Sequence, residues 1–205
     1  IELKSNNKNN DIAIVALHGY GSNSSNMSDL LSAINIKDVN CYFPSGTIEL
    51  YHNNISKAWF SIPFATYLED EILKSRQSIL LQIDQLRNNG YSYKKIILLG
   101  FSQGAMMCLD IMINLPKPIL GVVCLSGLNI TINENTKIDN KFKTTPVYVG
   151  HGIYDDVIDL QSAKSSFQLL SRQGFKVNWK EYKLSHEVGE NEIIDIKSFV
   201  KKISI

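Results

Sequence analysis

The stretch YKKIILLGFSQGAM, residues 93–106, decides the fold expected for this chain. Its first half is an apolar run typical of a buried strand, and its second half begins an apolar helix. Between them lies a G-x-S-x-G pattern at residues 100–104. The two glycines allow a sharp turn from strand to helix, because side chains there would clash with neighbouring elements. The turn is therefore either a plain connection or a structure that exposes Ser102 above a sheet.

Strands and helices alternate on both sides of this turn. Strands are expected at 11–19, 39–44, 94–100, 119–127, 145–152 and 176–183, and helices at 24–36, 67–90, 103–115, 160–174 and 191–203. Several of the strands are apolar almost throughout, which favours a mostly parallel central sheet with helices on both faces, the α/β class. Residues 1–10 suit a short strand or a polar lead-in. Residues 45–65 suggest a loop with exposed aromatic side chains.

Composition predicts one soluble domain over residues 1–205. Hydrophobic residues make up 44% and charged residues 20%, and the formal net charge is +1. The Lys and Arg residues are scattered, which argues against a nucleic-acid partner. No apolar run approaches the roughly 20 residues of a membrane helix, so stable membrane insertion is not expected. The chain starts at Ile1, which leaves a removed leader open.

The cysteines indicate a reducing compartment. There are three, Cys41, Cys108 and Cys124, and the last two lie in strongly apolar segments. An odd number in such surroundings is typical of buried thiols and argues against a disulfide framework or a metal site. We therefore expect a cytoplasmic protein.

A serine nucleophile at Ser102 requires a base, because its hydroxyl is nearly inert at neutral pH. Reactive groups of parallel sheets collect at the carboxyl ends of the strands. In hydrolases with this turn the chain order is serine, acid, histidine, which leaves His151 and His186. His151 directly follows a strand and suits a structural role. His186 lies in the loop before the last helix and is the preferred base.

The acid is expected among Asp155, Asp156 and Asp159, just after the strand at 145–152. A carboxylate at this position would orient the imidazole and stabilise its cation. Paired aspartates after a strand can also cap a helix. Asp155 is preferred as the acid, and Asp156 is the second candidate or the cap.

Two backbone N–H groups are candidates for an oxyanion hole. One belongs to Gln103, the residue after the nucleophile. The second belongs to Tyr20 in the glycine-bearing loop LHGYGSN, residues 17–23, which follows an early strand. This loop alone could be an ordinary turn, so the assignment of Tyr20 depends on the other residues.

Seven segments, in order, resemble one family: LHGYG, AWFSI, LEDEILKSRQSI, KIILLGFSQGAM, GVVCLSG, GHGIYDDVI and YKLSHEVGENEI. They are similar to the acyl-protein thioesterase and lysophospholipase-like carboxylesterases of the α/β-hydrolase superfamily. The resemblance spans about residues 11–203. It implies an α/β-hydrolase fold without a large cap domain, Ser102 as nucleophile, Asp155 as acid, His186 as base, and Tyr20 with Gln103 as oxyanion hole. It implies no metal and no cofactor.

The chain departs from the family pattern at several positions. Ala105 stands where a second glycine is common, Ser185 precedes the histidine in place of glycine, and Ser61 follows Trp-Phe in place of aspartate. The family's proline after the acid is also missing, since Val157 is followed by Ile158 and Asp159. The triad residues are unaffected, so these changes bear on substrate specificity.

The loop around Trp59, Phe60 and Phe64 is the candidate substrate-binding region. These aromatics either pack as a core staple or form an acyl-binding wall. The expected substrate is a small-molecule or lipid-like ester with a short to medium acyl group, with thioesters and lysophospholipids as further candidates. The alternatives are a hydrolase of lactones or peptides, and a non-catalytic binding protein with the same fold.

Overall fold

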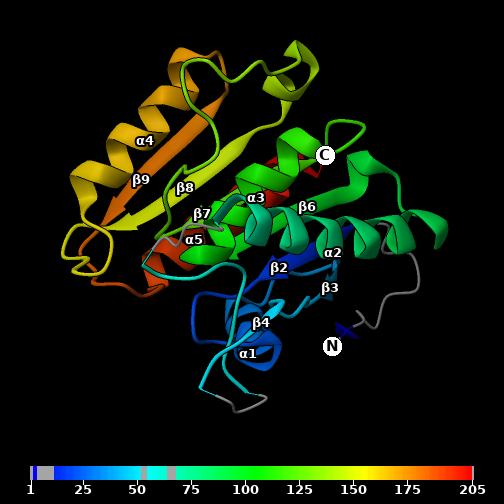
Figure 1. Cartoon of the computed structure of the whole chain (residues 1–205), viewed down its shortest axis with the longest axis horizontal. Coiled ribbons are helices and arrows are strands. Elements are labelled where there is room, and N and C mark those ends of the chain that lie inside the picture. Colours follow the sequence, from blue (N-terminus) through cyan, green and yellow to red (C-terminus); the bar gives the residue numbers. More distant parts are fainter. Residues whose placement is uncertain (1, 4–11, 52–54, 64–67, 205) are drawn as a thin grey trace.

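The centre of the fold is a seven-stranded sheet, within the residues that the computed structural model describes: 2–3, 12–51, 55–63 and 68–204. The strand order is β1 (Glu2–Leu3), β3 (Asn40–Tyr42), β2 (Ala13–Leu17), β6 (Ile96–Phe101), β7 (Gly121–Leu125), β8 (Val147–Gly152) and β9 (Val177–Tyr182). All neighbours pair in parallel except β1 and β3 (Figure 1). The predicted mostly parallel sheet is confirmed.

Five helices cover both faces of this sheet in the described part of the chain (Figure 1). They are α1 (Ser24–Ile34), α2 (Leu68–Asn88), α3 (Gln103–Asn114), α4 (Leu160–Arg172) and α5 (Glu190–Ile203). Helices α2, α3 and α4 pack on one face, together with strand residues such as Val15 and Leu98. Helices α1 and α5 pack on the other face with Ile14 and Leu99. This alternation along the central strands β2, β6, β7 and β8 buries both of their faces, as the continuous apolar runs predicted.

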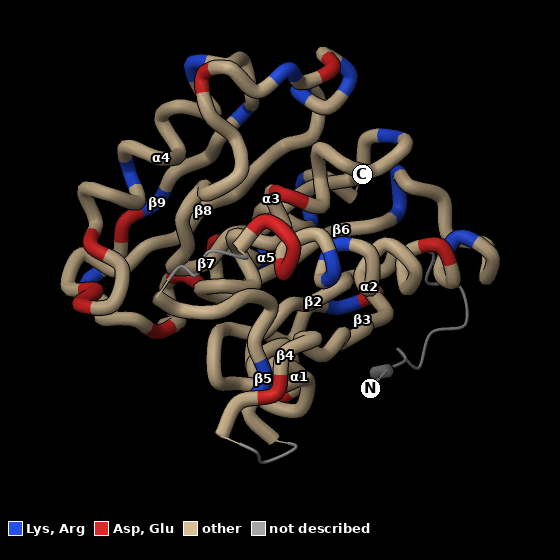
Figure 2. The backbone as a smooth tube through the Cα atoms, in the orientation of Figure 1, with Lys and Arg blue, Asp and Glu red and all other residues tan. Residues whose placement is uncertain are grey.

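Charged side chains are spread over the molecule, with Lys and Arg interspersed among Asp and Glu (Figure 2). Over the described residues, the helices are too short or too polar for any of them to cross a bilayer.

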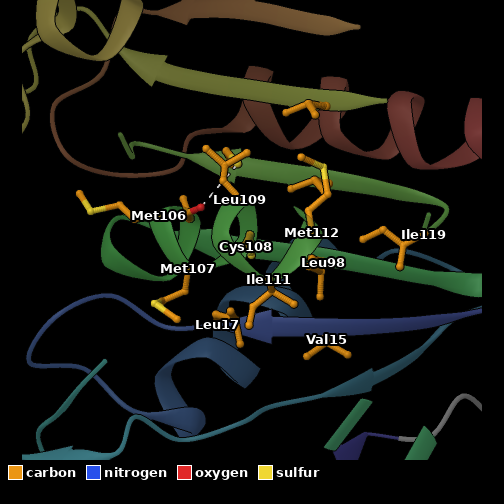
Figure 3. Close-up of a cluster of buried hydrophobic side chains, with 14 of the residues drawn as sticks. Val15, Leu17, Leu98, Met106, Met107, Cys108, Leu109, Ile111, Met112 and Ile119 are labelled. Carbon is orange, nitrogen blue, oxygen red and sulfur yellow. Dashed lines mark hydrogen bonds between the residues drawn. The ribbon is translucent and has the colours of Figure 1, made fainter. Parts of the chain in front are cut away.

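Helix α3 occupies the middle of the core. Its side chains from Ala105 to Met112 are buried, and they pack against Val15 and Leu17 of β2 and Leu98 of β6 (Figure 3). A helix whose residues are buried on all sides needs such a central position. The start of α3 is thereby fixed relative to the sheet, and the turn at residues 100–104 is fixed with it.

The segment 45–65 differs from the expected exposed loop. It contains a short antiparallel pair, β4 (Ile48–Glu49) with β5 (Lys57–Ala58). Trp59 and Phe60, for which both core packing and an acyl-binding wall were open, are fully buried in the core. Two 3-10 helices, Tyr93–Lys95 and Asn140–Thr144, complete the regular elements that the structure describes.

The register of the sheet aligns the carboxyl ends of the strands along one edge. Leu17 lies opposite Gly100, Phe101 opposite Leu125, and Gly152 opposite Tyr182. The loops that follow β2, β6, β8 and β9 therefore come together at one edge. These four loops carry the candidate residues of the active site.

Candidate active site

Ser102 lies between β6 and α3 in a strained backbone conformation. Its φ of 54° and ψ of −119° fall in a region of backbone conformation that residues other than glycine rarely adopt. Such a conformation costs about 1–3 kcal/mol and persists only where the surroundings impose it. The backbone N–H of Ser102 donates a hydrogen bond of 2.8 Å to the carbonyl oxygen of Leu125, which fixes the turn to β7.

The two glycines of the turn are required by close backbone contacts. A Cβ atom on Gly104 would lie 2.1 Å from the carbonyl oxygen of Leu17 at the end of β2. A Cβ atom on Gly100 would lie 2.3 Å from the carbonyl carbon of Gly104. Strand β2, strand β6 and helix α3 thus approach closer than any side chain allows, as the sequence pattern predicted.

Asp155 and His186 come together from the loops after β8 and β9. The Oδ2 atom of Asp155 lies 2.8 Å from Nδ1 of His186, so the imidazole donates from Nδ1 to the carboxylate. The other carboxylate oxygen accepts the backbone N–H groups of Val157 at 3.0 Å and Ile158 at 2.8 Å. The imidazole ring packs against the ring of Phe101, the residue that precedes Ser102, with a distance of 4.9 Å between the ring centroids. This arrangement leaves Nε2 as the basic nitrogen of His186.

The pKa of Asp155 lies below its ordinary value. Burial of the carboxyl raises its pKa, but the hydrogen bonds from the backbone of Ile158 and from the ring of His186 together lower the pKa by more than burial raises it. Asp155 is therefore a carboxylate at neutral pH, able to stabilise a positive charge on His186.

His151 lies beside this pair but is held differently. Its side chain is fully buried, and Nε2 lies 2.8 Å from the carbonyl oxygen of Ile158 and 3.4 Å from Oδ2 of Asp155. Its ring stacks on Trp179 at a centroid distance of 6.0 Å. Because Nε2 of His151 donates its proton to the carbonyl of Ile158, in the turn that carries Asp155, this nitrogen is not available as a base. This placement supports the structural role expected for His151.

The loop after β2 passes next to Ser102. A Cβ atom on Gly19 would lie 3.3 Å from the Cβ atom of Ser102. The far side of the loop is tied to β5, since the N–H of Gly21 donates to Lys57 and the N–H of Lys57 donates to Ser22, both at 2.9 Å. Tyr20 lies in the turn between these anchors.

Gln103 is the first residue of α3, where backbone N–H groups have no partner within the helix. Its N–H group and that of Tyr20 thus belong to the two segments that meet at Ser102. Their role as oxyanion donors stays a prediction.

Trp59 and Phe60 are not exposed as an acyl-binding wall. Both have 0% exposure and belong to the main core cluster, which favours the packing alternative. Aromatic rings of this size contribute most when fully buried, and here the backbone of the loop is satisfied by the side chain of Gln103. The Gln103 Oε1 atom accepts the N–H of Trp59 at 2.8 Å, and its Nε2 donates to the carbonyl of Phe60 at 2.6 Å. Phe64 lies outside the described residues.

The side chain of Gln103 is a contribution that the sequence reasoning missed. It was considered only for its backbone N–H group, yet its amide is 1% exposed and joins α3 to the segment before α2. A glutamine inside an otherwise apolar helix start was the available signal, because a buried amide needs partners for both its donor and its acceptor.

His18 is a second buried polar residue near the site. Its Nδ1 lies 2.8 Å from the carbonyl oxygen of Gly19, and its Nε2 accepts the N–H of Gly46 at 2.9 Å. Burial lowers the pKa of His18, and the hydrogen bond to Gly19 opposes this in part. His18 is thus a neutral ring that ties the loop after β2 to the segment before β4.

The His, Cys, Asp and Glu side chains are the usual protein ligands of metal ions. In the described part of the chain, these side chains form no group of three or more that could hold a metal ion.

Known proteins resemble this chain over nearly its whole length. A model of the phospholipase/carboxylesterase family matches residues 1–204. Acyl-protein thioesterase 1 of Candida albicans is 31% identical, over 99% of this chain and 96% of that protein. Acyl-protein thioesterase 1 of Debaryomyces hansenii is 30% identical, over 93% and 90%. The crystal structure of Arabidopsis thaliana SOBER1 shares the fold, with a TM-score of 0.82, 22% identity, and coverage of 95% of this chain and 99% of that one.

Proposed function

We propose that this chain, which belongs to the phospholipase/carboxylesterase family of serine hydrolases, cleaves carboxylic esters and thioesters. The residues that carry the reaction are Ser102, His186 and Asp155. The observation that carries the proposal is the 2.8 Å contact between Asp155 and His186 at the sheet edge where the strained Ser102 lies. A carboxylate on Nδ1 fixes the tautomer that makes Nε2 a base.

The reaction follows from this arrangement in two steps. In the first, Ser102 attacks the acyl carbon while Nε2 of His186 takes the hydroxyl proton and passes it to the leaving group. In the second, water attacks the acyl-enzyme, with His186 again as base and Ser102 as the leaving alcohol. In both steps the negative oxygen of the tetrahedral intermediate receives hydrogen bonds from the N–H groups of Gln103 and Tyr20.

The substrate we propose carries a short to medium acyl chain. Three exposed apolar side chains belong to segments that carry or adjoin site residues: Tyr154 and Val157 flank Asp155 in the chain, and Ile62 follows the buried Trp59 and Phe60. An acyl chain lying across this open surface would contact them without entering a deep tunnel. The names of the fungal relatives support thioesters as substrates, and we include small-molecule and lipid-like esters in the proposed substrate class.

We also propose a reducing, cytoplasmic location. All three cysteines are free and buried. Burial raises the pKa of Cys41 to about 11, so its thiol stays protonated and unreactive.

The test is covalent labelling with an alkyl fluorophosphonate followed by peptide mass spectrometry. We expect the label on Ser102, and loss of both labelling and esterase activity in Ser102→Ala. A series of p-nitrophenyl esters of increasing chain length, with matched thioesters, lactones and amides, identifies the bond that is cleaved. Labelling at another residue contradicts the mechanism. Hydrolysis of lactones or amides in preference to esters contradicts the substrate class, and Ser102→Ala with unchanged biological effect favours a binding protein.

A further inference from the structure

Trp59 links the two segments that carry the oxyanion donors. Its backbone N–H donates to Oε1 of Gln103 at 2.8 Å. Its indole Nε1–H donates to the carbonyl oxygen of His18, also at 2.8 Å. One buried residue therefore binds the first residue of α3 and the start of the loop that carries Tyr20.

The carbonyl of His18 lies where the loop after β2 contacts helix α3. A Cβ atom on Gly104 would lie 2.7 Å from this oxygen, so the loop rests on the first turn of the helix. The ring centroids of His18 and Trp59 lie 5.0 Å apart, and Nε2 of His18 also accepts the N–H of Gly46. The position of this carbonyl sets where the chain starts toward Tyr20, two residues later.

Trp59 is itself held from the side of α2. Its carbonyl oxygen accepts the hydroxyl of Ser75 at 2.6 Å, and this hydroxyl lies 2.7 Å from that of Thr47. The amide of Gln103 donates to the next carbonyl, that of Phe60, at 2.6 Å. The indole is 0% exposed, so it has no space to move away from the carbonyl of His18.

We propose that Trp59 is a positioning residue of the oxyanion hole, holding the backbone of Gln103 and the loop of Tyr20 at a fixed separation. This inference rests on the proposed function, since the oxyanion hole is part of it. Hydrogen-bond donors stabilise the tetrahedral intermediate only when they are preorganised, and loss of one costs about 10²–10³ in kcat. A displacement of about 1 Å can cost about 10².

The primary variant is Trp59→Phe, which removes the indole N–H and keeps an aromatic ring in the core. We expect kcat to fall about 10- to 100-fold with KM within about twofold of wild type, because the donors act on the transition state. The affinity of an alkyl trifluoromethyl ketone, which forms a tetrahedral adduct with the serine, should fall by the same factor. The affinity of the matching methyl ketone, bound without an adduct, should stay the same.

The matched control is Trp179→Phe. Trp179 is the other tryptophan of the chain, and its Nε1 donates at 2.8 Å to Glu181 on the outer strand β9. We expect wild-type kcat and wild-type affinity for the trifluoromethyl ketone. Gln103→Met is the second variant, because it removes the acceptor for the Trp59 N–H and leaves the indole in place. It should show the same fall in kcat at unchanged KM, and it decides the question if Trp59→Phe fails to fold.

Two results would overturn the inference. One is a folded Trp59→Phe or Gln103→Met protein with wild-type kcat. The other is a loss of kcat that leaves the affinity for the trifluoromethyl ketone unchanged, since the donors would then be intact. If wild-type Ser102 is labelled by the fluorophosphonate while either result is obtained, only the role of Trp59 is wrong. If wild-type Ser102 is not labelled, the proposed function fails and the oxyanion hole fails with it.

Discussion

The two oxygens of the Asp155 carboxylate have separate partners, the backbone N–H groups of residues 157 and 158 on one side and His186 on the other. In Asp155→Asn the amide cannot accept on both sides, and the imidazole loses its charged partner. We expect kcat/KM to fall by about 10³–10⁴, as for loss of a triad carboxylate in general. Steady-state hydrolysis of a p-nitrophenyl ester measures this.

The control for this prediction is Asp156→Asn, because Asp156 is the adjacent residue and its side chain is exposed. We expect its kcat/KM to stay within about threefold of wild type, as for most surface changes. If Asp156→Asn causes the larger loss, the acid lies one residue further along the chain.

At the scale of residues, the sequence predicted which side chains contact each other better than it predicted which side chains are buried. The chain order serine, acid, histidine left two histidines and three aspartates as candidates, and the preferred pair, Asp155 and His186, does lie in contact, because strand ends of a parallel sheet share one edge. Their catalytic roles stay predictions. Trp59 was harder to place, since a loop rich in Pro, Gly and Asn is ordinarily exposed. Its backbone N–H is satisfied by the side chain of Gln103, a contact 44 residues away that no local pattern shows.

Helices α2 and α3 are joined by one ion pair that should contribute strongly to stability. Arg76 of α2 binds both carboxylate oxygens of Asp110 of α3, with two contacts of 2.7 Å, and the Asp110 side chain is 1% exposed. Removing Arg76 leaves a buried carboxylate without its cation. We expect Arg76→Met to lower the free energy of unfolding by about 3 kcal/mol, measured by urea denaturation.

The control for this prediction is an ion pair with the same contact distance whose side chains are exposed. Lys164 of α4 contacts Glu181 of β9 at 2.7 Å, with side chains 40% and 33% exposed. Lys164→Met should cost less than about 1 kcal/mol, because water screens an exposed pair. Equal losses in the two variants would show that burial of Asp110 does not set the strength of the Arg76 contact.

At the scale of elements, long periodic segments were predictable, and the two-residue strands β4 and β5 were not. In α2 the spacing of Ile72, Ile79, Ile83 and Leu86 predicts one buried helix face, and all four residues are buried. Strands β4 and β5 have two residues each, too few for an alternating pattern. They form because the loop after β2 supplies backbone partners for Lys57, a tertiary contact.

The stability of the whole molecule should depend on pH through one buried carboxyl, that of Glu192 in the first turn of α5. It is 1% exposed, and its Oε1 atom has no hydrogen-bond partner among the described residues. A Cβ atom on Gly150 of β8 would lie 1.9 Å from this oxygen, so the carboxyl is pressed against the sheet. Burial raises the pKa of Glu192 to about 7, opposed by the N–H of Gly189 and helped by the charge of Asp195.

An unfolded chain holds this glutamate at a pKa of about 4.3. Between that pH and about 7 the folded protein keeps a proton that the unfolded chain has lost, so stability falls as pH rises through this window. Glu192→Gln removes the titration, so its stability relative to wild type should rise by about 3 kcal/mol from pH 5 to pH 8.5, measured by urea denaturation. Glu190→Gln removes a carboxyl from an exposed position in the same turn and should not reproduce the rise expected for Glu192→Gln. A Glu192→Gln difference that is constant with pH, or that shrinks as pH rises, would mean that this carboxyl is ionised in the folded protein throughout the range.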